Sequence, residues 1–219
     1  MENTMIRNAL MTLCLAAPAL AQIPVRKDAP PYEPPAGWTI RLDDKDRAAD
    51  VSATRFVTMG SGFHVTSGPA ALYFNGKDTV SGAFTASAGF GQRKAPTHPE
   101  AYGLFIGGRN LTSPQQEYFY FLVRGDGKYY VAHRAGTEVH TIAPWTEHAA
   151  VRKQNDAGVA SNVVAFQVTP DSVHLLANQT RVKSFAKSEL HGFSTDGQVG
   201  LRVNHGLDVH IGEFRIRKP

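Results

Sequence analysis

Cysteine is almost absent from this chain. Its 219 residues include a single cysteine, Cys14, which lies inside an N-terminal segment with the features of a cleavable export signal. The mature chain would hold no thiol, which excludes disulfides, a cysteine nucleophile and thiolate metal ligands. An exported domain without disulfides depends on its hydrophobic core for stability.

Long apolar runs and blocks of like charge are also missing. No apolar run reaches the roughly 20 residues that a membrane-spanning helix needs. The net charge of +4 is small, and lysine and arginine are scattered along the chain. Because a phosphate backbone is bound by clustered positive charge, we expect no nucleic-acid partner, and no membrane span. The absence of an internal repeat argues against a propeller or a solenoid.

The N-terminal segment predicts export. Residues 1–21 contain a positive start at Arg7, an apolar stretch over 9–17 and a small-residue cleavage site that ends at Ala21. Cleavage after Ala21 would give a secreted or periplasmic protein. Residues 22–37 are rich in proline and hold little that can be buried, so they are expected to form an extended leader.

The remaining residues, 38–219, predict a single all-β domain. Short segments of alternating apolar and polar residues recur between turn signals, as in strands with one buried face. Residues 117–124 (EYFYFLVR) are apolar at both parities, which indicates a central strand covered on both faces. Asp126-Gly127 predicts a hairpin turn to a strand at 128–133. About a dozen strands are typical of a two-sheet antiparallel jelly-roll sandwich.

Two segments outside this strand pattern are expected to be irregular. The stretch 188–193 has room for one helical turn at most, and 92–100 (QRKAPTHPE) reads as a long loop. Trp145, which follows a proline, is expected to pack at an edge of the sandwich, with stacking on a sugar as the alternative.

Two segments resemble the concanavalin A-like superfamily of lectins, glucanases and laminin-G-like domains. The first, YFYFLVRGDGKYYVAHRAG, covers 118–136. The second, within 162–216, holds NVVAFQV, VHLLANQTRV and GQVGLRVNHGLDVHIGEFRI, with Asn178-Gln179 where Asn-Gly is usual. The resemblance lies nearest to exported bacterial domains related to 3-keto-disaccharide hydrolases. It implies a jelly roll that binds carbohydrate or glycoconjugate on a concave sheet and its bordering loops.

The resemblance does not extend to glucanase catalysis. Glucanases of this superfamily place three acids on one strand face with a Glu-x-Asp-x-Glu run, which this chain lacks. The acidic run at 43–46 (DDKD) does not replace it and is expected to be solvated surface. We therefore expect a non-catalytic binding domain. Two alternatives remain: a hydrolase related to the 3-keto-disaccharide enzymes, with Asp208 and His210 as acid and base, and a scaffold domain without a small-molecule site.

Polar side chains gather near the C-terminus, in the string NHGLDVH at 204–210. Alternation puts Asp208 and His210 on the face opposite the apolar residues of their strand. His64, between two apolar neighbours, also points away from the core. If the segments on either side of Gly206 pair with each other, one sheet face carries a polar cluster made of Arg202, Asn204, Asp208 and His210.

This cluster has three interpretations. In the structural one, Asp208 pairs with Arg202 or with a neighbouring histidine and no ligand is involved. In the metal one, His205, Asp208 and His210 coordinate an ion together with His64. We assign no metal site or cofactor, and calcium is the ion left open. The carbohydrate interpretation uses planar polar groups and a wall of Tyr118, Tyr120 or Tyr130. Its predicted ligand-binding residues are Arg202, Asn204, His205, Asp208, His210, His64, Tyr118 and Tyr120.

Overall fold

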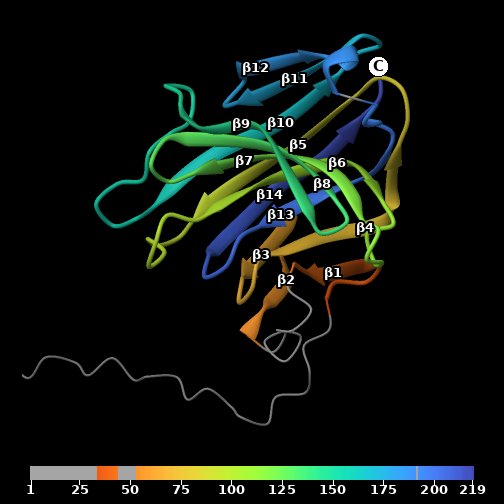
Figure 1. Ribbon diagram of the computed structural model, residues 1–219. Helices are drawn as coiled ribbons and strands as arrows, with labels where there is room; N and C mark the ends of the chain where they lie inside the picture. The colour runs from red at the N-terminus through yellow and green to blue at the C-terminus, as the bar shows by residue number, and fades with distance from the viewer. Residues whose placement is uncertain (1–33, 44–52, 191) are drawn as a thin grey trace, which may run out of the picture. The chain divides into compact units, whose positions relative to one another are not determined.

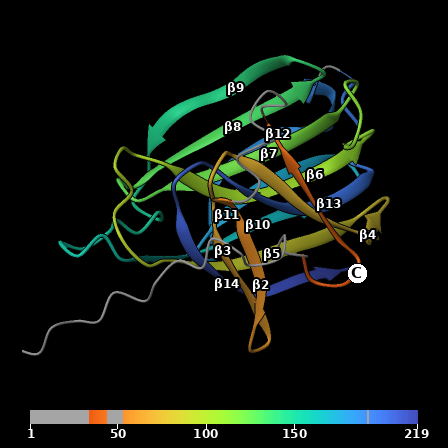
Figure 2. The same cartoon turned by 90° about the horizontal axis from the view of Figure 1, so that it is seen from below.

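The computed structural model describes residues 34–43, 53–190 and 192–219 (Figure 1). The expected signal sequence and residues 22–33 of the proline-rich leader lie outside these residues. Within the described residues, 14 strands form two antiparallel sheets of seven strands each. This is the all-β sandwich that the alternation pattern predicts, with slightly more strands than expected. In Figure 2, β9, β8, β7 and β6 lie in one layer and β10, β5 and β14 in the other.

Sheet I contains the central strand that the sequence predicts at 117–124. Its strands, in spatial order, are β1 (Trp38–Leu42), β4 (Ala71–Val80), β13 (Gly197–Val203), β6 (Ala101–Arg109), β7 (Glu117–Arg124), β8 (Lys128–Ala135) and β9 (Glu138–Glu147).

Sheet II forms the other layer. Its strands, in spatial order, are β12 (Thr180–Ala186), β11 (Ser172–Ala177), β10 (Ala160–Val168), β5 (Phe84–Gln92), β14 (Asp208–Arg217), β3 (Gly62–Thr66) and β2 (Arg55–Met59).

The two faces of strand β7 pack into two different apolar clusters. Phe119 and Phe121 belong to the main core cluster, together with inward side chains of β5, β10 and β14. Tyr118 and Tyr120 alternate with them and belong to a second buried cluster on the outer face of sheet I, with Leu72 and Phe105. The prediction of a strand covered on both faces is confirmed.

The predicted turn after β7 is also confirmed. The Gly127 N–H donates to the Arg124 carbonyl (3.0 Å), and Gly127 has a φ of 86°, which favours glycine. β8 then pairs antiparallel with β7.

The irregular segments follow the prediction too. One 3-10 turn, η2 (Lys187–Leu190), lies in the stretch expected to hold a single helical turn. The chain from 93 to 100 contains no strand or helix. None of the residues described here forms a helix of the length and apolarity needed to cross a membrane.

Candidate functional site

The predicted C-terminal polar cluster is not assembled as expected. β13 belongs to sheet I and β14 to sheet II, so the two strands do not pair across Gly206. The turn between them carries the chain from one layer to the other. Arg202 therefore lies on a different sheet from Asp208 and His210. The prediction of one shared face is wrong because alternation fixes which face a side chain occupies, but not which sheet its strand joins.

Three of the predicted site residues do meet, on the outer face of sheet II. His64 and His210 are cross-strand partners in β3 and β14. The His64 Nε2 atom lies 3.2 Å from Asp208 Oδ1, and Lys94 Nζ lies 4.0 Å from Asp208 Oδ2. Burial lowers the pKa of His64, against the opposing pull of Asp208. Asp208 thus contacts a neighbouring histidine, as in the structural interpretation.

His205 lies apart from these three residues. Its Nε2 atom is 3.0 Å from Glu100 Oε1, at the turn between β13 and β14. The expected metal set of His205, Asp208 and His210 with His64 is therefore not brought together. Asn204 also lies at this turn, where its N–H donates to the Ala101 carbonyl (2.9 Å).

Arg202 is the buried charge on the outer face of sheet I, with 7% of its surface exposed. Its guanidinium donates two hydrogen bonds to Asp43 (2.9 and 2.5 Å) and one to the Tyr118 hydroxyl (3.0 Å). Burial opposes both charges. The attraction between Arg202 and Asp43 nevertheless holds the pKa of Asp43 below its usual value, and Tyr118 and Asp43 raise the pKa of Arg202.

The role of Asp43 corrects a prediction. The acidic run at 43–46 was expected to be solvated surface, but Asp43 is the half-buried ion-pair partner of Arg202, and 44–46 lie outside the described residues. The physical reason is the alternation of β1, whose residues 38, 40 and 42 pack on the core. Asp43 follows on the opposite parity and so points to the outer face of sheet I.

A row of rings extends from Arg202 across sheet I. We call Tyr118, Tyr120, Tyr130 and Trp145 the aromatic row. The Arg202 guanidinium lies 4.8 Å from the Tyr120 ring centre, and the Tyr120 and Tyr130 ring centres are 6.0 Å apart. Tyr130 and Trp145 stack at 5.0 Å with an interplanar angle of 28°. Tyr118 and Tyr120 are buried, whereas Tyr130 and Trp145 are half-buried and reach the surface.

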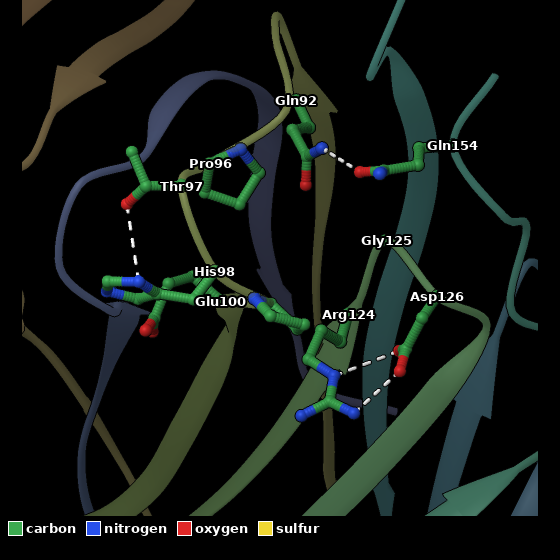
Figure 3. Close-up of a pocket in the computed structure, with 10 residues that line it drawn as sticks. Gln92, Pro96, Thr97, His98, Glu100, Arg124, Gly125, Asp126 and Gln154 are labelled. Atoms are coloured by element: carbon green, nitrogen blue, oxygen red, sulfur yellow. Dashed lines mark hydrogen bonds and ion pairs between the residues drawn. The ribbon is translucent and has the colours of Figure 1, made fainter. Parts of the chain in front are cut away.

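Arg124 closes the far end of the aromatic row. Its guanidinium lies 4.3 Å from the Trp145 ring centre and donates two hydrogen bonds to Asp126 (2.9 and 2.6 Å). Arg124 and Asp126 also line a cavity of about 140 Å³, whose opposite wall holds His98 and Glu100 (Figure 3). The aromatic row therefore leads from the ion pair of Arg202 and Asp43 to a polar cavity.

The buried end of the row carries more positive than negative charge. Arg41 and Arg134 are both close enough to influence the pKa of Asp43, whose carboxylate is already bonded to Arg202. Arg41 donates to the carbonyls of Leu111 and Ser113, and Arg134 to that of Gly136. Within the part of the chain that the structure describes, neither guanidinium forms an ion pair with a carboxylate.

Sequence reasoning found part of this surface. It proposed Tyr118, Tyr120 and Arg202 as ligand-binding residues, and the structure places these three side chains together on one face. It missed Arg124, which it treated only as a strand end. The available signal was parity, because Arg124 stands at the same parity as Tyr118 and Tyr120 in β7.

No protein-family model and no curated protein matches the chain. Solved structures match in fold. The carbohydrate binding module CBM66 of Bacillus subtilis aligns with a TM-score of 0.60 at 11% identity, over 86% of this chain and 100% of the module. The GH16 protein of a Bacteroides ovatus mixed-linkage glucan PUL gives 0.58 at 10% identity, over 85% and 97%. A variant of alginate lyase A1-II′ gives 0.54 at 10% identity, over 84% and 95%. The chain thus shares with these structures the two-sheet antiparallel jelly-roll fold that the resemblance implies.

Proposed function

We propose that the domain binds a carbohydrate on the outer face of sheet I, over the exposed end of the aromatic row. The observation that carries this proposal is the stacked pair Tyr130 and Trp145, which reaches the surface beside the guanidinium of Arg124. Aromatic rings offer apolar area to the C–H face of a pyranose, and nearby charged donors orient its hydroxyls. The carbohydrate binding module among the similar structures supports the same assignment.

The charge at the buried end of the row favours an acidic group on a saccharide that extends along the row from its exposed end. Arg202 is neutralised by Asp43 and Arg124 by Asp126, which leaves Arg41 and Arg134 without a carboxylate partner among the described residues. A guanidinium matches a carboxylate or sulfate group in both charge and geometry. We therefore expect uronic acid or sulfated saccharides to bind more tightly than neutral ones.

Binding can be tested with a glycan array that holds neutral, uronate and sulfated oligosaccharides, followed by calorimetric titration of the best ligand. Trp145→Ala should weaken binding by about tenfold or more, because it removes the ring surface. Trp145→Phe should retain most of the affinity. His174→Ala changes a half-buried residue of sheet II, away from the aromatic row, whose side chain bonds to Ser184, and the variant should bind as the parent does.

Two results would contradict the proposal. One is the absence of any saccharide hit on the array. The other is equal affinity of the Trp145→Ala and parent proteins for the same ligand. A turnover assay on a bound saccharide tests the hydrolase alternative with Asp208 and His210, since a non-catalytic domain releases its ligand unchanged.

We also infer that the protein is exported and is cleaved after Ala21. The support is the three-part pattern of residues 1–21 and the absence of cysteine from 22 onward. N-terminal sequencing of the protein recovered from a periplasmic or secreted fraction should begin at Gln22. Recovery of the full-length chain from the cytosol alone would contradict this inference.

A further inference from the structure

Two loops that are distant in sequence meet beside sheet I. Val203 pairs with Tyr102, and the Asn204 N–H continues this ladder by donating to the Ala101 carbonyl (2.9 Å). This pairing brings the next residue, His205, beside Glu100. The loop that precedes β6 adds His98 from the other side.

The three side chains direct their donor atoms to one point. His205 Nε2 lies 3.0 Å from Glu100 Oε1 and 3.1 Å from His98 Nε2. One ligand atom from each of the three groups lies within 4.8 Å of the ligand atoms of the other two. Among the residues that the structure describes, this is the one group of three histidine or acidic side chains with such a geometry.

Hydrogen bonds alone do not account for the two close contacts of His205 Nε2. A ring nitrogen has one position in the ring plane, which holds either a proton or a lone pair. His205 Nε2 therefore makes one well-directed hydrogen bond, yet it has two partners at bonding distance. A cation between the three groups would accept a lone pair from each of them at once.

We propose that His98, Glu100 and His205 bind a divalent transition-metal ion of the Zn²⁺ type. Tetrahedral zinc with bonds of roughly 2.0–2.1 Å separates its ligand atoms by about 3.4 Å. The observed contacts of 3.0 and 3.1 Å lie close to this value. Two imidazole nitrogens and one carboxylate oxygen are a typical zinc set, whereas calcium takes six to eight oxygen ligands.

The exposed fractions of Glu100 and His205 fit a metal site with a buried carboxylate on one side and solvent on the other. The Glu100 side chain is 9% exposed, and the His205 side chain is 51% exposed. His98 and Glu100 also border the cavity that Arg124 and Asp126 line (Figure 3). Three protein ligands leave a fourth coordination position for water or for a ligand oxygen, as in open zinc sites.

The test is a Zn²⁺ titration of the full chain, produced without a histidine tag and freed of metal by a chelator. Competition with a chromophoric chelator should give one tightly bound equivalent per chain. His205→Ala and Glu100→Gln should each weaken binding by at least about tenfold. His174→Ala removes a histidine that has no part in the cluster and should leave the affinity unchanged.

The design separates loss of the site from loss of the fold. His205 is half exposed, so His205→Ala should keep the parent's melting temperature in the absence of metal, while the parent alone is stabilised by added Zn²⁺. The chain also holds a stacked pair, His133 and His140, with ring centres 5.9 Å apart. Absence of saturable binding, unchanged binding by His205→Ala, or a loss that follows His133→Ala instead would each overturn the proposal.

Discussion

At the scale of single residues, the ion pair of Arg202 and Asp43 decides what the outer face of sheet I can hold. A guanidinium that is 7% exposed needs most of its hydrogen bonds, and Asp43 and Tyr118 accept three from its two terminal nitrogens, while the buried Nε has no partner among the described residues. The pair fixes one end of the aromatic row, because Arg202 also lies over Tyr120.

The first prediction concerns this pair. Asp43→Ala leaves the Arg202 charge buried without a carboxylate, which should cost about 3 kcal/mol of unfolding free energy. Urea denaturation followed by circular dichroism measures this loss. Glu147→Ala is the matched control: it removes a carboxylate that lies 2.6 Å from Lys153 Nζ, at a site where both side chains are more than half exposed. A similar transition midpoint for the two variants would contradict our view of the Arg202 pair.

At the scale of elements, the strands were predictable because their pattern is local. Alternation and the doubly apolar run of β7 identify strands and faces from neighbouring residues alone. The assignment of β13 and β14 to different sheets depends on long-range pairing, which alternation does not encode. The meeting of His98, Glu100 and His205 depends in addition on the path of two loops. The polar cluster predicted around Gly206 does not form because β13 and β14 belong to different sheets, which alternation does not encode.

The second prediction concerns the hairpin between β11 and β12. Ala177 pairs with Thr180, so Asn178 and Gln179 form a two-residue turn, and their φ angles are 50° and 69°. Asparagine tolerates this left-handed conformation, but glutamine is strained in it. Gln179→Gly should therefore stabilise the protein by about 0.5–1 kcal/mol.

Thermal and urea unfolding of the parent, Gln179→Gly and Gln179→Ala measure this effect. Alanine keeps the steric conflict between Cβ and the backbone, so Gln179→Ala should give no gain. A gain of the same size with alanine, or a loss with glycine, would show that strain at this turn is not the cause. Asn178 stays unchanged throughout, because its side chain bonds to Ala150 and to the buried Asn162.

At the scale of the whole molecule, a partly buried histidine makes stability depend on pH. The His133 side chain is 18% exposed, contacts Glu117 (3.2 Å) and packs against Phe193. Burial lowers the pKa of His133, and His140 lowers it further, although Glu117 acts in the opposite direction. The unfolded chain then binds a proton more readily than the native one does.

The third prediction follows from the lowered pKa of His133 in the native state. Stability from neutral His133 is present above the unfolded pKa of about 6.5 and is lost as the pH falls below it. The urea midpoint should drop between about pH 7.5 and pH 5.5, and His133→Gln should reduce this drop. Glutamine does not titrate and can still donate a hydrogen bond to Glu117. An identical pH dependence in the parent and the variant would exclude His133 as a source.

The most direct test of carbohydrate binding on sheet I uses the two tryptophans of the chain. Trp38 packs against Phe56, Phe63 and Phe214, and Trp145 belongs to the aromatic row. Trp38→Phe keeps an aromatic ring in the core and leaves Trp145 as the one source of tryptophan fluorescence. We would titrate this variant with the best saccharide from the array. A saturable change in emission, absent from Trp145→Phe, is the predicted result. Binding that leaves the Trp145 emission unchanged would place the ligand elsewhere and contradict the account.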